Sequence, residues 1–267
     1  FCGRLTGLSP LTTYEARAVS DNEYGEIIKF TTGAALQLPN SNFDSWWLDG
    51  KVWNPWPENG EQYWDTGNKG ATTLGPSNTQ PTDDTPTGTG LAARLETKFV
   101  GIGMLGKLAA GNLFAGKYVR TDGTNGILDF GHPFTDRPTG LSGYMKYTTA
   151  PISSVTTGFE NLKGRPDTCI IWCALIDADS PFQIRTNPKD RNLFDPEADN
   201  VIAYGKYETG ADVPAYVPFH FDLVYKDTQR APKYILVTCS ASKYGDYFTG
   251  GNGAILFIDD FKLTYDY

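Results

Sequence analysis

The sequence predicts an all-β fold, a jelly-roll β-sandwich preceded by part of an Ig-like or fibronectin-like β-sandwich. Short runs of alternating or continuous apolar residues recur along the 267 residues, and no stretch shows a strong helical period. The 29 Gly and 17 Pro supply turns between these runs, and the many aromatic residues are typical of strands. A chain of this length can form one large β domain or two smaller ones.

The first 33 residues predict the C-terminal strands of a fibronectin type III-like module. The run TYEARAVS (13–20) alternates like a half-buried strand, and a second apolar run follows at 26–32. In this resemblance Tyr14 is the corner tyrosine that ties a turn back to the sheet. Half a sandwich leaves strand edges and apolar faces uncovered, so we expect further domains upstream in the same chain. Residues 34–39 are the predicted linker.

The second predicted domain runs from residue 38 to 267. Its first fifty residues are rich in Trp, Asn, Gly, Pro and Thr and predict long loops, while the remainder predicts strands joined by turns, as in a jelly roll. The expected strands are LAARLETKFVG (91–101), YVRT (118–121), GILDFG (126–131), LSGYMKYT (141–148), TCIIWCALID (168–177), AYVPFHFDLVY (215–225), KYILVTCSAS (233–242) and AILFIDDFKLTYDY (254–267).

The charge balance excludes some partners. The chain carries 23 Lys and Arg against 31 Asp and Glu, a formal net charge of −8, and no basic cluster interrupts this acidic balance. Because such a field repels phosphates, we expect neither nucleic acid nor an anionic membrane surface as a partner. No apolar run approaches the length of a transmembrane segment. With only two His, acid–base chemistry would fall mostly to carboxylates.

The cysteines predict buried free thiols. Cys169 and Cys173 are four positions apart in an expected strand, which separates them by about 13 Å along the strand axis. That separation is too large for a disulfide between them. No cysteine spacing fits a zinc site.

Six aromatic residues crowd into 19 positions near the start of the second domain. They are Trp46, Trp47, Trp53, Trp56, Tyr63 and Trp64. Indole rings stack on the apolar faces of sugars, and the interleaved amides and carboxylates could hold sugar hydroxyls. The alternative is an aromatic plug that belongs to the core. We expect Trp46 in the core, and Trp53, Trp56 and Trp64 as candidates for a sugar-binding surface.

Several segments together resemble a known family. They are NFDSWW (42–47), YWDTGNKG (63–70), RPTGLSGYMKY (137–147), CALIDAD (173–179), PFHFDLVY (218–225) and SASKYGDYFTGGNGAILFIDDFKLTY (240–265). Taken together and in this order, they resemble the putative carbohydrate metabolism domain of Bacteroidetes surface proteins. The resemblance implies a β jelly roll after an Ig-like or fibronectin-like domain, on exported, outer-membrane-anchored lipoproteins that act in polysaccharide utilisation.

A glycine-rich loop, SKYGDYFTGGNG (242–253), is a second candidate for ligand contact. Its glycines permit tight turns from which Asp246 and Tyr247 would project. The alternative is a hairpin shaped by its glycines alone. Neither a Lys-Ser/Thr pair nor a following helix supports a phosphate-binding loop.

A structural Ca²⁺ site is a further hypothesis. Many carbohydrate-binding jelly rolls hold Ca²⁺ near the start of the domain with an Asp from the last strand, and such a site needs several oxygen ligands. The corresponding candidates here are Asn42, Asp44 and Asp260, the last in the pair Asp259-Asp260. Alternation along a strand would send that pair to opposite faces.

A pair of catalytic carboxylates is the enzymatic alternative. Glycoside hydrolysis uses two carboxyl groups about 5–5.5 Å apart for retention or about 6.5–9.5 Å apart for inversion. The candidates are Glu61, Asp65, Asp136 and Asp246. We expect Arg137 to bind a ligand carboxylate or pair with a nearby Asp, and His132 and His220 to serve in packing.

These observations predict an extracellular or cell-surface domain that recognises a polysaccharide or oligosaccharide without catalysis. The expected binding residues are Trp53, Trp56, Trp64, Asp65, Arg137, Asp246 and Tyr247. A glycoside hydrolase and a structural or adhesive module that binds no sugar remain alternatives.

Overall fold

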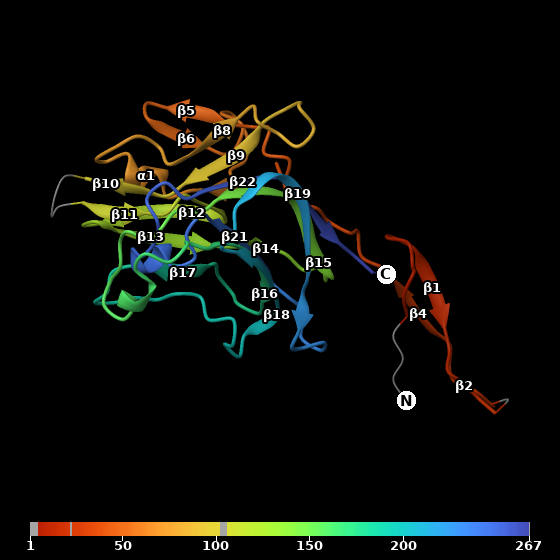
Figure 1. The fold of residues 1–267 in the computed structure, drawn as a ribbon. Helices are drawn as coiled ribbons and strands as arrows, with labels where there is room; N and C mark the ends of the chain where they lie inside the picture. Colours follow the sequence, from red (N-terminus) through yellow and green to blue (C-terminus); the bar gives the residue numbers. More distant parts are fainter. Residues whose placement is uncertain (1–4, 22, 102–105, 267) are drawn as a thin grey trace.

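The structure, a computed structural model, describes residues 5–21, 23–101 and 106–266. Two antiparallel sheets pack face to face, so the expected all-β sandwich is confirmed (Figure 1). The larger sheet runs in the order β17 (Phe182–Arg185), β13 (Asn125–Phe130), β12 (Asn112–Asp122), β21 (Tyr234–Ser240), β16 (Cys169–Ile176), β18 (Val201–Thr209) and β20 (Val224–Tyr225), with β14 (His132–Pro133) beside β21 and β7 (Trp64–Asp65) beside β12.

The smaller sheet has the order β19 (Val213–Asp222), β15 (Gly140–Thr148), β22 (Ile255–Thr264), β9 (Ala92–Glu96) and β8 (Thr79–Thr82). The described two-stranded pairs are β1 (Thr13–Ala16) with β4 (Ile28–Thr31), β2 (Val19–Ser20) with β3 (Glu23–Tyr24), β5 (Trp47–Asp49) with β6 (Val52–Asn54), and β10 (Lys98–Val100) with β11 (Lys107–Ala109). The described helical turns are α1 (Asn68–Ala71), η2 (Glu160–Leu162) and η3 (Gly245–Tyr247).

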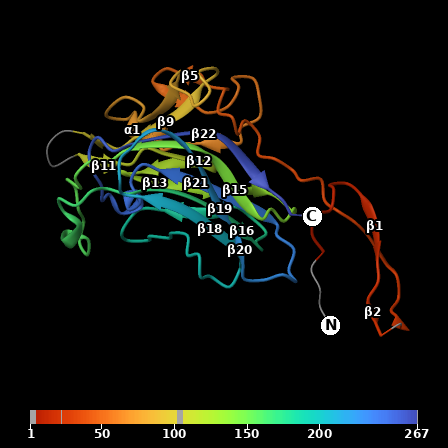
Figure 2. The ribbon, with the colours of Figure 1, turned by 45° about the vertical axis from the view of Figure 1, so that its right-hand side comes forward.

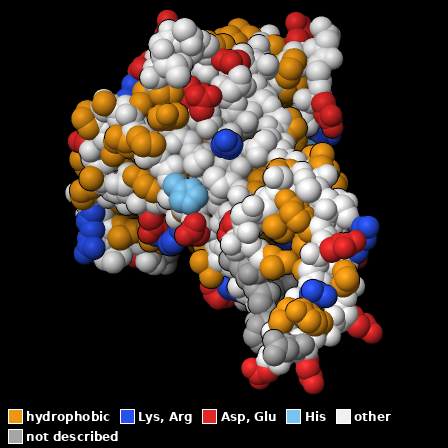
Figure 3. Space-filling model, turned by 90° about the vertical axis from the view of Figure 1, so that its right-hand side faces the viewer, with side chains coloured by type: hydrophobic (Ala, Val, Ile, Leu, Met, Phe, Trp, Pro, Cys, Tyr) orange, Lys and Arg blue, Asp and Glu red, His pale blue; other side chains and the backbone are white. Residues whose placement is uncertain are grey.

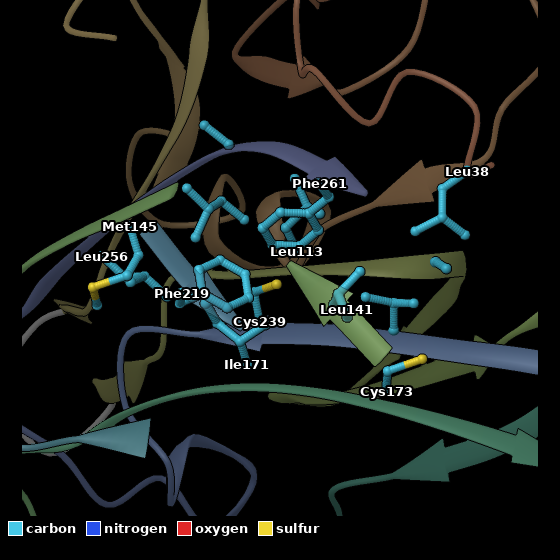
Figure 4. Close-up of a cluster of buried hydrophobic side chains, with 14 of the residues drawn as sticks. Leu38, Leu113, Leu141, Met145, Ile171, Cys173, Phe219, Cys239, Leu256 and Phe261 are labelled. Carbon is cyan, nitrogen blue, oxygen red and sulfur yellow. The ribbon is translucent and has the colours of Figure 1, made fainter. Parts of the chain in front are cut away.

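The main core lies between the two sheets. Leu113, Ile171 and Cys239 from the larger sheet face Met145 and Leu256 from the smaller one, and all five are fully buried (Figure 4). Cys169 and Cys173 are buried free thiols, as predicted, and Cys239 is a further buried free thiol. Cys2 lies outside the described residues. Burial of this apolar surface is the main driving force for closing the sandwich.

A second core lies on the outer face of the larger sheet, under the segment that joins β17 to β18. Phe194 from that segment stacks on Trp172 of β16, with ring centroids 4.8 Å apart and planes at 7°. Phe114, Phe130 and Ile176 pack in the same cluster. The larger sheet is therefore covered on both faces in this region, which leaves little of it for a flat ligand.

The N-terminal strands form a separate ribbon beside the sandwich (Figure 2). The Tyr14 hydroxyl accepts a hydrogen bond from the Ser9 amide at 2.9 Å, a contact of the corner type that the sequence suggested. Leu11, Val19 and Ile28 are more than half exposed, and hydrophobic side chains reach the surface of this ribbon (Figure 3). Its assignment to a fibronectin type III module stays a prediction.

The linker is held firmly against the sandwich. The side chain of Gln37 accepts a hydrogen bond from the Leu263 amide and donates one to the Leu263 carbonyl, both at 2.9 Å. Asp136 accepts the Leu36 amide at 3.1 Å, and Leu38 is buried in the main core. Asp136 therefore fixes the linker to the sandwich.

Strand β12 bends where it crosses from the core to one end of the sandwich. Gly116 has φ +141°, and a Cβ there would lie 2.1 Å from the Asp129 carbonyl oxygen. Two residues later the pairing with β13 shifts register between Tyr118 and Arg120. The buried carboxylate of Asp65 accepts the Tyr118 amide at this irregular point, at 2.8 Å.

Trp64 and Trp53 should differ sharply in their contribution to stability. Trp64 is fully buried, packs edge-on against Phe43 and donates its indole N–H to the Pro39 carbonyl at 2.8 Å, whereas Trp53 is only half buried. We expect Trp64→Ala to lower the free energy of unfolding by about 3–5 kcal/mol and Trp53→Ala by about 1 kcal/mol or less. Urea denaturation measures both, and equal losses would contradict the burial pattern.

Candidate functional site

A cavity of about 160 Å³ lies among α1, β11 and η3. Of these elements, α1 and β11 are labelled at the end of the sandwich remote from the N-terminal ribbon (Figure 1). The walls of the cavity come from α1 and the segment after it, from β11, from the turn between β12 and β13, and from η3. A cavity of about 150 Å³ holds one benzene-sized ring. The space therefore suits a single small ring, with room for a longer ligand to continue outward.

Glycines bring these walls close together. Gly123, with φ +61°, turns the chain from β12 into β13. A Cβ on Gly245 would lie 2.3 Å from the Ala110 Cβ, and one on Gly70 would lie 2.8 Å from the Tyr118 hydroxyl. Position 123 favours glycine because of its positive φ, whereas Gly245 and Gly70 lie where neighbouring segments approach closely.

Asp246 lines this cavity and differs from the other inward-facing carboxylates. Among the described residues, its carboxylate makes neither a hydrogen bond nor an ion pair. Burial raises its pKa from 3.8 to about 6, although the nearby Arg191 works in the opposite direction. Burying a carboxylate without partners is costly, and such groups are concentrated at functional sites.

Asp65 shows the contrasting, structural case. Its carboxylate accepts hydrogen bonds from the Thr66 amide, the Tyr118 amide and the Gln62 side chain, each at 2.8 Å, and Lys69 lies 3.3 Å away. Burial raises its pKa, and Lys69 and these amides oppose that rise. With both carboxylate oxygens engaged and only 2% of the residue exposed, Asp65 does not reach a ligand.

Asp167 is also satisfied within the fold. It accepts the Ser242 hydroxyl, the Gly251 amide and the Thr168 amide. Burial raises its pKa, and these three donors lower it. Asp246 is therefore the candidate for external chemistry.

Polar groups beside Asp246 complete the cavity. Lys107 extends from β11 and places its amine 3.2 Å from the Asn125 side-chain oxygen. The Tyr118 hydroxyl is 2.7 Å from that of Thr121. Phe248 follows η3 in the left-handed region, with φ +55°, and its ring lies 4.2 Å from the Lys107 amine. The cavity thus combines an aromatic edge with hydroxyl, amide and charged groups, the mixture expected of a small-molecule site.

Comparison with known proteins identifies a family. The family described as "Putative carbohydrate metabolism domain" matches residues 42–264. The chain belongs to this family. No curated protein shows a significant match. Within the described residues, no helix is long and apolar enough to cross a membrane.

Two solved structures share the fold of this carbohydrate metabolism domain. One, described as a putative glycoside hydrolase from Bacteroides thetaiotaomicron, has a TM-score of 0.65 and 20% identity, over 90% of this chain and 75% of its own. The other, described as a putative glycoside hydrolase from Bacteroides vulgatus, has a TM-score of 0.63 and 22% identity, over 84% of this chain and 96% of its own.

The structure shows the tryptophan-rich segment of the domain to be largely an aromatic plug. Trp64 is fully buried and Trp56 is 9% exposed, so the expectation that both lie on a binding surface is wrong. Trp46 packs against the core, as expected. Trp53 is half buried and lines a shallow hollow with Leu48 and other residues of the segment 48–80.

The hollow and the cavity are neighbours. Gly75 and Pro76 line the hollow, while Thr73 and Leu74 just before them line the cavity. Leu74 is 60% exposed on the ridge between the two. Of the predicted aromatic residues, Trp53 is thus the one placed to extend the Asp246 site.

The remaining catalytic candidates do not join Asp246. Asp136 binds the linker through the Leu36 amide. Glu61 is exposed near His132. Burial lowers the pKa of His132, and the charge of Glu61 opposes this effect only in part. Neither Asp136 nor Glu61 lines the cavity. The carboxylate pair expected from the sequence is therefore not assembled among the described residues around this site.

Arg137 has a structural role instead of binding a carboxylate. Its guanidinium donates to the Arg230 and Asp227 carbonyl oxygens, each at 3.0 Å, and lies 4.7 Å from the Tyr225 ring. It secures a surface loop. The sequence could not show this because its hydrogen-bond partners are backbone carbonyls.

The two histidines differ. The His132 ring stacks on that of Tyr63, with ring centroids 4.2 Å apart. Its Nε2 lies 2.7 Å from the Tyr63 carbonyl oxygen. These contacts confirm that His132 serves in packing. His220 is exposed beside Asp222, 3.0 Å away, so the expectation that it packs is wrong.

Two of the residues expected to hold Ca²⁺, Asn42 and Asp44, are hydrogen-bonded to each other. The Asp44 carboxylate accepts the Leu91 amide at 2.7 Å and the Asn42 side-chain amide, so Asn42 presents its nitrogen there. No group of three His, Cys, Asp or Glu among the described residues is arranged for a metal. A calcium site at Asn42, Asp44 and Asp260 stays a prediction.

The last strand departs from simple alternation at its acidic pair. Asp260 has φ +50° and is exposed, and the pairing of β22 with β15 shifts register at this point. Burial, followed by the charges of Asp260 and Asp44, raises the pKa of Asp259 to about 7.

Asp246→Asn should stabilise the protein at high pH. The pKa of Asp246 is raised from 3.8 to about 6 in the folded protein. Above pH 6 the folded protein therefore carries a desolvated charge at this position, and below pH 6 the carboxyl group is neutral. We expect the variant to gain about 1–3 kcal/mol in free energy of unfolding at pH 8, with the gain vanishing toward pH 4. Urea denaturation at the two pH values measures the change.

The exposed carboxylate of Asp83 provides a matched control. Asp83→Asn should change the free energy of unfolding by about 0.5 kcal/mol or less at either pH. Destabilisation by Asp246→Asn at pH 8 would show that Asp246 has a stabilising partner and would remove the reason for assigning it a binding role.

Proposed function

We propose that this protein recognises a saccharide in the cavity beside Asp246. The single observation that carries the proposal is a carboxylate that lines a ring-sized cavity without any partner among the described residues. Sugars offer several hydroxyl donors on one ring, and an ionised carboxylate accepts such bonds strongly. Membership of the carbohydrate metabolism domain family supports the same ligand class.

The distribution of carboxylates supports binding over hydrolysis. A two-carboxylate mechanism needs a second acid within about 5–9.5 Å of the first, and Asp246 is the only carboxylate among the described residues that line the cavity. The other polar residues in the lining are Thr, Asn, Tyr118 and Lys107. These groups can orient a sugar ring, and no second carboxyl group among the described lining residues is placed to attack the sugar or activate a water.

Hydrolysis is the second candidate function. A pKa of about 6 would let Asp246 donate a proton near neutral pH, as a general acid must. The two structurally similar Bacteroides proteins are described as putative glycoside hydrolases.

An extracellular or cell-surface location, consistent with a polysaccharide ligand, is part of the main proposal.

The adjoining hollow suggests how a longer glycan would lie. A ring in the cavity could be followed by a second unit that crosses the Leu74 ridge and stacks on the exposed part of Trp53. Aromatic side chains with a free face favour such apolar contacts. Binding should therefore strengthen from a monosaccharide to a disaccharide.

A glycan array followed by calorimetry on each positive glycan tests the proposal. We expect at least one plant or host glycan to bind, Asp246→Ala to weaken it at least about tenfold through loss of the charged acceptor, and Asp83→Ala to leave it unchanged. No binding to any glycan, or equal affinity in both variants, would overturn the assignment. Incubation of each bound glycan follows, and release of reducing ends would establish hydrolysis instead.

A further inference from the structure

Lys107 brings an unpaired positive charge to the cavity. Its amine contacts the neutral oxygen of Asn125 at 3.2 Å and lies over the Phe248 ring at 4.2 Å. Within the described part of the chain it forms no ion pair. Burial, followed by the charge of Arg191, lowers its pKa. This amine therefore occupies a site where an anion would be favourable.

Arg191 adds a second positive charge behind the cavity wall. Its guanidinium lies over the Tyr247 ring at 4.7 Å and donates a long hydrogen bond, 3.4 Å, to the carbonyl oxygen of Thr186, a residue that lines the cavity. Its Nε–H is buried without an acceptor. Its charge acts on both Lys107 and Asp246, yet it forms an ion pair with neither.

Several other cations in the described part of this acidic protein are paired with carboxylates. Lys233 lies 2.9 Å from both Asp177 and Asp179, and Lys69 lies 3.3 Å from Asp65. Lys107 lines the cavity and Arg191 lies behind its wall, while Asp246 is the one carboxylate among the described lining residues. The local charge is therefore positive, although the chain carries a formal net charge of −8. Unsatisfied buried donors and unpaired cations are costly unless a ligand supplies the missing acceptor.

We propose that the cavity selects an acidic saccharide, with a sugar carboxylate facing Lys107 and ring hydroxyls donating to Asp246. The inference rests on the proposed function, and adds to it the chemical class of the sugar. In this arrangement Lys107 is the binding residue, since it lines the cavity. Arg191 is a positioning residue whose charge strengthens attraction of the anion from behind the wall. Uronic acids carry the required carboxyl group on a six-membered ring.

The arrangement also accounts for the separation of charges around Asp246. A direct ion pair between Asp246 and Arg191 would satisfy both groups and leave neither for a ligand. Because Asp246 and Arg191 do not pair, the negative and positive charges at the cavity both stay available. A ligand with an anionic edge and a hydroxyl edge can therefore interact with both. A neutral sugar satisfies only the Asp246 side of this pattern.

Pairs of oligosaccharides that differ only by a carboxyl group provide the test. The probes are trisaccharides of galacturonate and galactose, glucuronate and glucose, and mannuronate and mannose, measured by calorimetry at pH 7.5 with the full chain. We expect the acidic member of at least one pair to bind ten or more times more tightly than its neutral partner. Raising the salt concentration should narrow this difference, because screening weakens the attraction.

Variants assign the preference to a residue. Lys107→Met keeps the aliphatic stem and the contact with Phe248, so we expect it to bring the acidic ligand down to the affinity of the neutral one. Lys117→Met is the matched control, since Lys117 is an exposed lysine of β12 and does not line the cavity. Arg191→Gln should reduce the same preference by a smaller factor. Circular dichroism and thermal unfolding verify that each variant is folded.

The outcomes separate this inference from the proposed function. Equal or tighter binding of the neutral members, or equal effects of Lys107→Met and Lys117→Met, would overturn the acidic preference and leave saccharide binding in place. Absence of binding to every saccharide, on the array as well, would overturn both. Inorganic phosphate that binds as tightly as the sugars and competes with them would show a general anion site, which also overturns the inference.

Discussion

The hydrogen bonds of the buried Asp65 carboxylate determine the shape of the end of the sandwich where the cavity lies. They join the loop before α1 to β12 at the irregular point of that strand. Because Tyr118 then lines the cavity and Gly70 packs against its hydroxyl, two walls of the site depend on this one carboxylate. A charged group with four donors is stable at depth, since its hydrogen bonds replace those of water.

The contrast between Asp65 and Asp246 links stability to function. Both carboxyl groups have raised pKa values, yet the first is surrounded by donors and the second has none among the described residues. Proteins retain such unfavourable groups where a ligand completes them, and they lose some stability as a result. The positive charge of Arg191 reduces that loss without forming an ion pair with Asp246, so the carboxylate stays available.

Much of the fold could be predicted from the sequence. Continuous runs of apolar residues predicted β16 and β21, and the alternation of apolar and polar residues predicted β15 and most of β22. The strand β18, VIAYGKYET, was missed because a central glycine and charged residues interrupt its pattern. The alternation rule also failed at Asp260, where a left-handed residue shifts the register. These failures arise where strand pairing, which is set by tertiary contacts, overrides the local pattern.

The site was only partly accessible from the sequence. The glycines around Asp246 predicted tight turns in its loop. Lys107 and Arg191 are distant from that loop in the sequence, and only the folding of the sheets brings their charges near the cavity. Composition could not separate the buried Trp64 from the half-buried Trp53, because both occur in the same aromatic cluster.

The most direct test of the binding site is a crystal structure with a bound glycan. Density for a sugar ring against Asp246 and Lys107 is the predicted result, whereas a ring bound elsewhere, with this cavity left to solvent, would contradict the assignment.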